Sequence, residues 1–314
     1  MTPRLKGALA PVLTPFRADL EPDVPRFVAH CRWLVDNGAG LAIFGTNSEA
    51  NSMSVDERLR LADALLEAGV PAAKMMPGTG ASSIADAVTL TRHAVKSGAA
   101  GVLMLPPFYY KGVGDAGLFD YYAHVIDKVA SDELRIYLYH IPQVTQVPIT
   151  LGLIEMLRKR FPDTVVGAKD SSGNWDNTKA LLDHFAQDGF DVFPASESLL
   201  SQALSLGAAG CISATVNLNP AGIRALYERW NTPEGPQLQA RADVIRKIFQ
   251  SPNMIPAMKR VAAEFSGHAD WAVVRPPLTR LGEEAAARLL RELQAAGFSM
   301  PGFAERLTGE TKSG

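Results

Sequence analysis

Short apolar runs alternate with longer segments of helical periodicity along the chain, and the alternation repeats eight times. The runs are rich in Val, Ile, Leu and Ala and predict strands. A strand that is apolar throughout is typical of a sheet covered on both faces, and alternation with helices predicts parallel strands joined by right-handed crossovers. The predicted strands are residues 7–15, 40–45, 74–78, 101–105, 135–139, 165–169, 191–194 and 210–213.

The segments between the strands carry helix start and stop signals. In the second segment, Ser54 and Glu57 have the spacing of a capping box, and Gly69 follows the last apolar position, where a left-handed residue ends a helix. Gly38 and Gly98 are placed in the same way after the first and third segments. The boundaries of the helical segments therefore support the alternating pattern.

Eight strand–helix units within about 230 residues predict a (β/α)8 TIM barrel, an α/β fold, over residues 1–231. An open doubly wound sheet is the alternative, and it is disfavoured because no G-x-G-x-x-G follows the first strand. Residues 232–304 read as a C-terminal helical extension interrupted by prolines, and the polar residues 305–314 as a disordered tail.

Composition limits the partners. The chain has 314 residues, 47% hydrophobic and 20% charged, with 31 basic and 33 acidic residues. The mixed charges favour neither a nucleic-acid partner nor a membrane surface, and without a signal-peptide pattern or a long apolar run we expect a cytoplasmic protein. Cys31 and Cys211 are isolated and are interpreted as core residues.

In barrels of this class, chemistry is built at the carboxyl ends of the strands. Lys169 ends the sixth predicted strand directly before the turn residues Asp170 and Ser171. No histidine pair or acidic cluster with metal-ligand spacing is present, so the pattern favours an amine nucleophile, with neither a metal nor an organic cofactor expected. Further polar residues at strand ends are Thr46, Asn47, Ser48, Glu49, Tyr109, Tyr110, Tyr139, His140, Ser196, Glu197, Ser213 and Thr215.

An ammonium group is a poor nucleophile, but an apolar barrel mouth penalises the charged form and favours the neutral amine. A neutral amine of Lys169 can attack a ketone and form an imine. That step needs a proton shuttle at the carbonyl oxygen, and the phenol of Tyr139 on the neighbouring strand is predicted to supply it.

Four motifs carry a family resemblance: GTNSE at 45–49, YHIP at 139–142, GAKDSSG at 167–173 and GCISATVN at 210–217. In this order and spacing the chain resembles the N-acetylneuraminate lyase and dihydrodipicolinate synthase family of pyruvate-handling class I aldolases. The similarity extends from APVLTPF near the start to Arg275-Pro276-Pro277-Leu278. It implies that Lys169 is the imine lysine.

The resemblance also implies roles for the residues around the lysine. Tyr139 would transfer protons while hydrogen-bonded to Thr46, and backbone N–H groups around Thr46 and Asn47 would hold the carboxylate of a 2-oxo acid. Tyr109 or Tyr110 would cross a subunit contact to complete the relay, and the carbonyl of Ile212 would line the site. Homotetramers built from close dimers are usual in the family, so a homotetramer is expected.

Departures from the family motifs narrow the substrate. Val144 occupies the position of an arginine that binds the second substrate in the lysine-biosynthetic synthases, which argues against 4-hydroxy-tetrahydrodipicolinate synthesis. The sialic-acid lyase pattern is imperfect too, because Ala214 replaces a substrate-binding serine. A hydroxylated 2-oxo acid such as a 2-keto-3-deoxy sugar acid fits better. Its predicted hydroxyl contacts are Gln143, Ser171, Ser196 and Glu197.

The sequence therefore predicts a Schiff-base lyase that either cleaves or forms a carbon–carbon bond with release or uptake of pyruvate, or eliminates water. A non-catalytic barrel that binds a 2-oxo acid is the alternative from another class, and it is disfavoured because the lysine and the phenol are both present. Three neighbouring residues have structural interpretations: His140 should face away from the site, Tyr137 should pack deeper in the barrel, and Glu49 should cap a helix.

Overall fold

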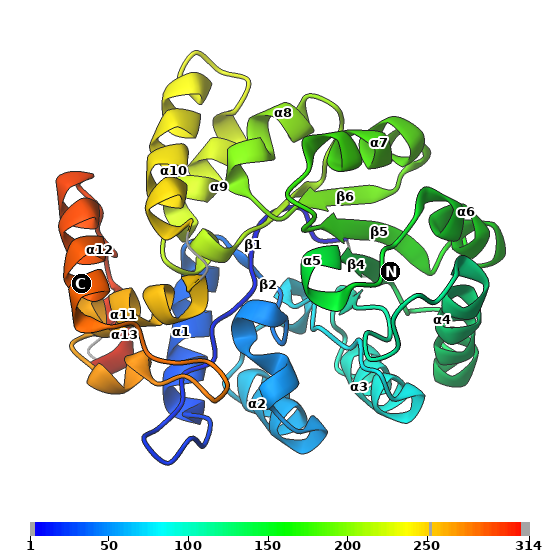
Figure 1. The fold of residues 1–314 in the computed structure, drawn as a ribbon, viewed down its shortest axis with the longest axis horizontal. Helices are drawn as coiled ribbons and strands as arrows, with labels where there is room; N and C mark the ends of the chain where they lie inside the picture. The colour runs from blue at the N-terminus through cyan, green and yellow to red at the C-terminus, as the bar shows by residue number, and fades with distance from the viewer. Residues whose placement is uncertain (1–3, 251–252, 309–314) are drawn as a thin grey trace.

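The computed structural model describes residues 4–250 and 253–308 (Figure 1). Within these ranges seven strands form two parallel sheets, ordered β2-β1-β7 and β3-β4-β5-β6. The strands are β1 Gly7–Ala10, β2 Gly40–Leu41, β3 Val102–Met104, β4 Ile136–His140, β5 Val165–Asp170, β6 Asp191–Pro194 and β7 Gly210–Ile212.

Backbone hydrogen bonds join the two sheets into a closed barrel. On one side, Met76 N–H donates to the Leu41 carbonyl at 2.8 Å, and Leu103 N–H donates to the Pro77 carbonyl at 2.8 Å. On the other side, Ala209 N–H donates to the Val192 carbonyl at 3.0 Å. The predicted (β/α)8 barrel is confirmed, with residues 75–79 in the place of the third strand.

Residues 74–78 are the one predicted strand that is not assigned as such within the described residues; only isolated bridges form there, at Met75 and Gly78. The N–H groups of Met76 and Gly78 donate to carbonyls on the β2 side, so in a regular strand the N–H of residue 77 would donate to the β3 side. Residue 77 is a proline and has no N–H. The first strand is likewise shorter than the predicted 7–15, because it ends before Pro11. Proline therefore explains both corrections.

Helices surround the strands in the order α1 Val24–Asp36, α2 Val55–Glu67, α3 Ile84–Lys96, α4 Asp115–Val129, α5 Pro142–Thr145, α6 Leu151–Arg160, α7 Trp175–Phe185, α8 Leu200–Leu204 and α9 Pro220–Arg229 (Figure 1). Short 3₁₀ helices lie between them: η1 Thr46–Ser48, η2 Ala50–Ser52, η3 Ala72–Lys74, η4 Ala186–Asp188, η5 Glu197–Leu199 and η6 Ala214–Asn217. The predicted capping box is confirmed, since Glu57 N–H donates to Ser54 Oγ at 3.1 Å and Ser54 N–H donates to Glu57 Oε2 at 2.7 Å.

The barrel is filled by side chains. One buried cluster takes members from every strand position, including Leu9, Met76, Tyr139 and Ile212, and is the interior core. Two larger clusters lie between the strands and the surrounding helices. Cys31 and Cys211 are buried and unpaired, as expected of core residues.

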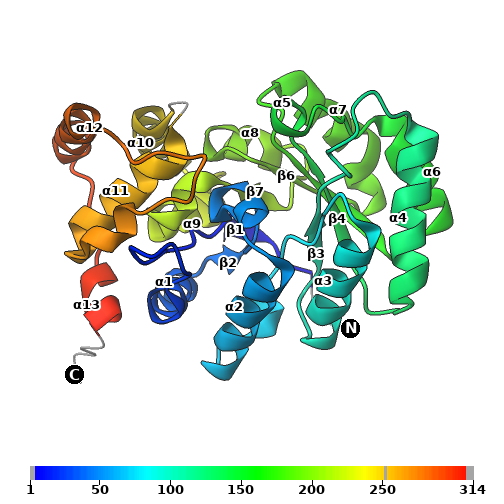
Figure 2. The same cartoon turned by 60° about the horizontal axis from the view of Figure 1, so that its bottom comes forward.

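After α9 the chain forms α10 Gly235–Phe249, α11 Met254–Ser266, the 3₁₀ helix η7 Ala269–Ala272, α12 Glu283–Ala295 and α13 Phe303–Thr308. These helices gather at one side of the barrel, where α10 packs on α9 and α13 packs on α1 (Figure 2). The predicted tail is corrected for residues 305–308, which belong to α13 because Phe303 inserts into the core; residues 309–314 lie outside the described ranges.

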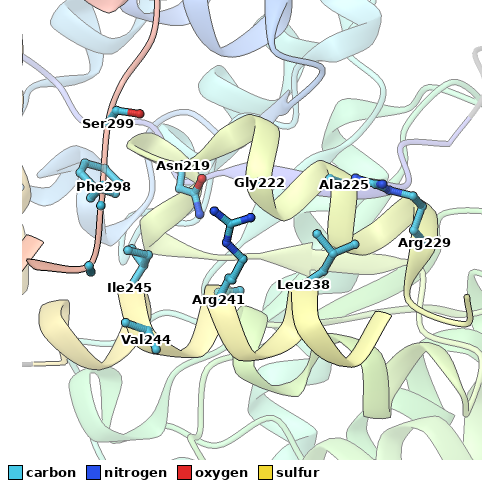
Figure 3. Close-up of a pocket in the computed structure, with 13 residues that line it drawn as sticks. Asn219, Gly222, Ala225, Arg229, Leu238, Arg241, Val244, Ile245, Phe298 and Ser299 are labelled. Carbon is cyan, nitrogen blue, oxygen red and sulfur yellow. The ribbon is translucent and has the colours of Figure 1, made fainter. Parts of the chain in front are cut away.

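A cavity of about 440 Å³ lies between α9, α10 and residues 296–299 (Figure 3). Arg241 extends from α10 toward Asn219 across this cavity, and Leu238, Ile245 and Phe298 contribute apolar walls. None of the strand-end residues predicted to carry chemistry lines it. The cavity therefore differs from the candidate site.

Candidate active site

Two buried side chains meet at the carboxyl ends of β4 and β5. The parallel register pairs Tyr139 with Lys169, so both side chains point into the barrel from neighbouring strands. Lys169 Nζ donates to the Tyr139 hydroxyl at 3.2 Å and lies 4.3 Å from the centroid of its ring. Each residue is only 3% exposed. The predicted amine and phenol are thus brought into direct contact.

Thr46 extends this pair across the barrel mouth. Its hydroxyl lies 3.1 Å from the Tyr139 hydroxyl, which gives a continuous Lys169–Tyr139–Thr46 chain. Thr46 opens the 3₁₀ helix η1, and the first N–H groups of any helix lack an internal acceptor. The N–H groups of Thr46 and Asn47 are therefore suited to hold an anion near the phenol.

The electrostatics of Tyr139 differ from those of an ordinary tyrosine. Burial by itself raises the pKa of Tyr139, but the charge of Lys169 and hydrogen bonds with Thr46, Lys169 and Ser171 more than offset it, so this pKa lies below its usual value. Within residues 4–250 and 253–308, no carboxylate lies within 4.0 Å of the Lys169 amine. The phenol therefore loses its proton more readily than an ordinary tyrosine, and it lies beside an amine that has no carboxylate within 4.0 Å in those residues.

The facing of β4 follows the predicted alternation. His140 points outward, where its Nδ1 accepts from Ile149 N–H at 3.0 Å, and burial lowers its pKa. Asp170, its partner in the register, accepts from Thr178 of α7 at 2.5 Å. Tyr137 faces the interior at the opposite end of the barrel and donates to Asp191 at 3.2 Å. These contacts support structural roles for His140 and Tyr137.

Comparison with known proteins decides the family. Residues 4–296 match the model of the dihydrodipicolinate synthetase family. This chain belongs to the dihydrodipicolinate synthetase family. Its members are lyases of the aldolase and synthase type that act through a Schiff base, and this chain is accordingly such a lyase.

Several members of the family illustrate the range. An uncharacterized DapA-like lyase of Chloroflexus aurantiacus is 34% identical, with 90% of this chain and 94% of that protein covered. A 4-hydroxy-tetrahydrodipicolinate synthase of Methanococcoides burtonii is 32% identical, with 92% and 98% covered. The structure of YagE of E. coli K12, in complex with pyruvate, has a TM-score of 0.84 at 26% identity, with 94% and 99% covered.

Four other residues predicted to line the site of this family member have contacts in the structure. Ser171 follows β5 and helps to lower the pKa of Tyr139, and Gln143 Nε2 donates to the Ser171 carbonyl at 2.5 Å. Ser196 Oγ accepts from Ser198 N–H at 3.3 Å, and Ile212 belongs to the interior cluster that contains Tyr139.

Two predicted carboxylates are engaged elsewhere. Glu197 accepts hydrogen bonds from the hydroxyls of Ser213 and Thr215 and lies 3.7 Å from Arg246 of α10. Glu49 was predicted to cap a helix, but its side chain makes no capping hydrogen bond. Its carboxylate instead forms a buried ion pair with Lys259 of α11. Both carboxylates therefore connect the barrel mouth to the C-terminal helices.

The two tyrosines after β3 lie at the surface. Tyr109 and Tyr110 are 72% and 74% exposed, and their rings contact each other with centroids 5.2 Å apart. Neither joins the Lys169–Tyr139–Thr46 chain within the part of the protein that the structure describes. Val144, on the short helix α5, is also exposed.

Sequence reasoning missed Lys259 and gave Arg275 no role. Both belong to the region after residue 231, and both contact Glu49. The signal in the sequence was Lys259 itself, which stands at a position of the apolar face in MIPAMKRVAAEFS, whereas the neighbouring Arg260 and Glu264 form an exposed pair. The described residues contain no group of three or more His, Cys, Asp or Glu arranged to hold a metal ion, and no helix among them could span a bilayer.

Proposed function

We propose that this protein condenses the ketone of a 2-oxo acid with Lys169 and then either breaks or forms a carbon–carbon bond, with pyruvate as one partner, or eliminates water from a 2-keto-3-deoxy sugar acid. The observation that carries the proposal is the buried contact between the Lys169 amine and the Tyr139 phenol, with Thr46 behind it. Membership of a Schiff-base lyase family supports the same chemistry.

The first step forms the imine. The neutral Lys169 amine attacks the ketone carbon, a carbon–nitrogen bond forms, and the nitrogen passes one proton through Tyr139 to the carbonyl oxygen. A second proton, taken up from solvent through the same phenol, lets that oxygen leave as water while the nitrogen lone pair forms the carbon–nitrogen double bond, and a protonated iminium remains. The iminium withdraws electrons from the neighbouring carbon, so it supports both carbon–carbon cleavage and dehydration.

The substrate carboxylate is proposed to bind the N–H groups of Thr46 and Asn47, because both lie at the start of η1 near the phenol. Ser171, Gln143 and Ser196 are available for hydroxyls on the distal chain, and Ile212 contributes its carbonyl. Glu197 is the weaker candidate because two hydroxyls already occupy its carboxylate.

A synthase activity with aspartate semialdehyde is the second candidate, since a relative at 32% identity is a 4-hydroxy-tetrahydrodipicolinate synthase. Val144 argues against it. An exposed valine cannot pair with the carboxylate of a second substrate as arginine can.

A homotetramer is part of the proposal. Two tyrosines that expose about three quarters of their surface are suited to a subunit contact, where Tyr109 or Tyr110 would reach the partner's relay. Diluted protein should then lose activity as it dissociates.

Borohydride reduction in the presence of pyruvate tests the imine. Mass analysis should find the reduced adduct on the peptide that contains Lys169, and no adduct there would overturn the proposal. A screen of 2-keto-3-deoxy acids for pyruvate release, beside aspartate semialdehyde with pyruvate, then separates the two candidate functions. Synthase-level turnover of aspartate semialdehyde would show that Val144 does not exclude that substrate.

A further inference from the structure

A buried charge network connects the C-terminal helices to the turn that carries Thr46. Lys259 of α11 is completely buried, and its amine donates to the Glu49 carboxylate and to the Val273 carbonyl, the latter at 2.9 Å. The second oxygen of Glu49 accepts from Arg275 N–H at 2.8 Å. Glu49 and Lys259 are 210 positions apart in the sequence.

A gain in stability does not by itself explain why this ion pair is buried. Removing two charges from water costs several kcal/mol per ion, and apolar residues of similar volume often stabilise a core as well or better. Buried ion pairs do, however, impose one geometry on the groups that they join. The position of Glu49 indicates which geometry is imposed here.

Glu49 ends the η1 turn. Its backbone is left-handed, with φ of 55°, and its N–H donates to the Thr46 carbonyl at 3.0 Å. A non-glycine residue holds this conformation only when its surroundings determine it. Because the side chain is bound to Lys259 and to the Arg275 backbone, the C-terminal helices hold the turn three residues from Thr46.

Arg275 holds the next part of the same loop. Its guanidinium donates to the Ser52 carbonyl at 2.7 Å and to the Leu20 carbonyl at 2.9 Å, and it forms an ion pair with Glu57. Both cations contact the Phe16 ring, whose centroid lies 4.3 Å from Lys259 Nζ and 4.6 Å from Arg275 Cζ. The chain from Glu49 to Glu57 is therefore fixed at both ends.

We infer that Lys259 and Arg275 are positioning residues, which act through Glu49 to keep the Thr46 hydroxyl within hydrogen-bond distance of the Tyr139 phenol. The inference rests on the proposed function, because the Tyr139–Thr46 contact matters for rate only if that phenol transfers protons. It gives the C-terminal helices a role in the reaction: they complete the mouth of the barrel.

The test is a double-mutant cycle in kcat that uses Glu49→Gln and Thr46→Val. Glutamine has the shape of glutamate but lacks its charge, so the turn should loosen and kcat should fall about 10- to 100-fold, since displacements near 1 Å at a reacting centre have effects of that size. If Glu49 acts through Thr46, the double variant should be no more than about 3-fold slower than Thr46→Val alone. Arg260→Gln is the matched control, because Arg260 neighbours Lys259 on α11 but forms its ion pair with the exposed Glu264.

Two results would overturn the inference: multiplied losses in the double variant, or an unchanged kcat in Glu49→Gln together with a lower Tm. If Glu49→Gln does not fold, Arg275→Lys replaces it in the same cycle. Lysine keeps the charge and the backbone N–H of Arg275, but it cannot reach Ser52, Leu20 and Glu57 together. We therefore expect a smaller loss of kcat, which should not appear when Arg275→Lys is combined with Thr46→Val. Borohydride trapping on the wild-type protein separates the two proposals. If the adduct forms on Lys169 but the kcat losses of Glu49→Gln and Thr46→Val multiply in the double variant, only the positioning role is refuted. If no adduct forms, the proposed function itself is refuted.

Discussion

Two buried lysines of this protein contact groups of different kinds. Lys169 contacts a phenol and lies within 4.0 Å of no carboxylate of the described residues, whereas Lys259 is buried against the carboxylate of Glu49. Burial lowers the pKa of Lys259 to about 8, although Glu49 opposes that shift. The comparison teaches that burial alone does not identify a reactive amine. Under the proposed function, the partner of a buried lysine decides whether that lysine holds structure or can react.

The comparison would break if both lysines formed adducts, or neither did. Lys169→Met should abolish the borohydride-trapped pyruvate adduct and lower kcat by about 10³-fold or more, because the variant lacks the proposed covalent nucleophile. Lys259→Met is the paired variant. It should destabilise the fold by roughly 3 kcal/mol, since it leaves Glu49 buried without its cation, yet retain the adduct on Lys169. Peptide mass analysis and urea denaturation measure the two effects.

Tyr139→Phe sharpens the comparison by removing the phenol and keeping the ring. The amine should still form an imine slowly, while kcat falls by about 10² to 10⁴, the usual size of general acid–base catalysis. Tyr137→Phe is the matched control on the same strand, because its hydroxyl bonds Asp191 away from Lys169. Steady-state kinetics of both variants test this expectation. Equal losses in the two would mean that packing of β4, not proton transfer, accounts for the effect.

The family and the barrel could be predicted from the sequence because both depend on local patterns. Apolar runs located each strand position, and Ser54 with Glu57 located the start of α2 correctly. The exact strand lengths could not be predicted. They depend on which backbone groups find a ladder partner, and Pro77 removes a donor from residues 75–79 in a way that hydrophobicity does not reveal.

The candidate site also contains contacts that the sequence predicts and contacts that it does not. Lys169 and Tyr139 follow from strand ends that become neighbours in a parallel sheet, and their register confirms the contact. Glu49 was predicted to be a cap because its local context suggests one. Its partner Lys259 is brought to it only by the packing of α11 against the barrel, and no local pattern encodes that contact.

Glu57 offers the smallest effect and tests the outer part of the network around Lys259. Its hydrogen bond to Arg275 is the main reason that its pKa falls to about 2, with its burial opposing the shift. A carboxyl whose pKa is lower in the folded protein than in the unfolded chain stabilises the fold above the unfolded value of about 4.3, and this contribution disappears as pH falls toward 2. Because the pair is partly exposed to solvent, the stabilisation should be only about 1 kcal/mol.

Glu57→Gln should therefore unfold more easily than the wild type at pH 7 by that amount, and the difference should shrink as pH falls and disappear below about pH 2. Glutamine keeps one oxygen, which can still accept from Arg275 Nη1 and from the Ser54 N–H. Its amide nitrogen replaces the oxygen that accepts from Arg275 Nη2, so the variant removes the charge together with one hydrogen bond. Urea denaturation at several pH values measures the difference, with Glu264→Gln in the exposed pair with Arg260 as the control that should change little at any pH. A stability difference that is independent of pH would assign the effect to the capping box, and would leave the pair of Lys259 and Glu49, not that of Arg275 and Glu57, as the charge pair that holds the η1 turn.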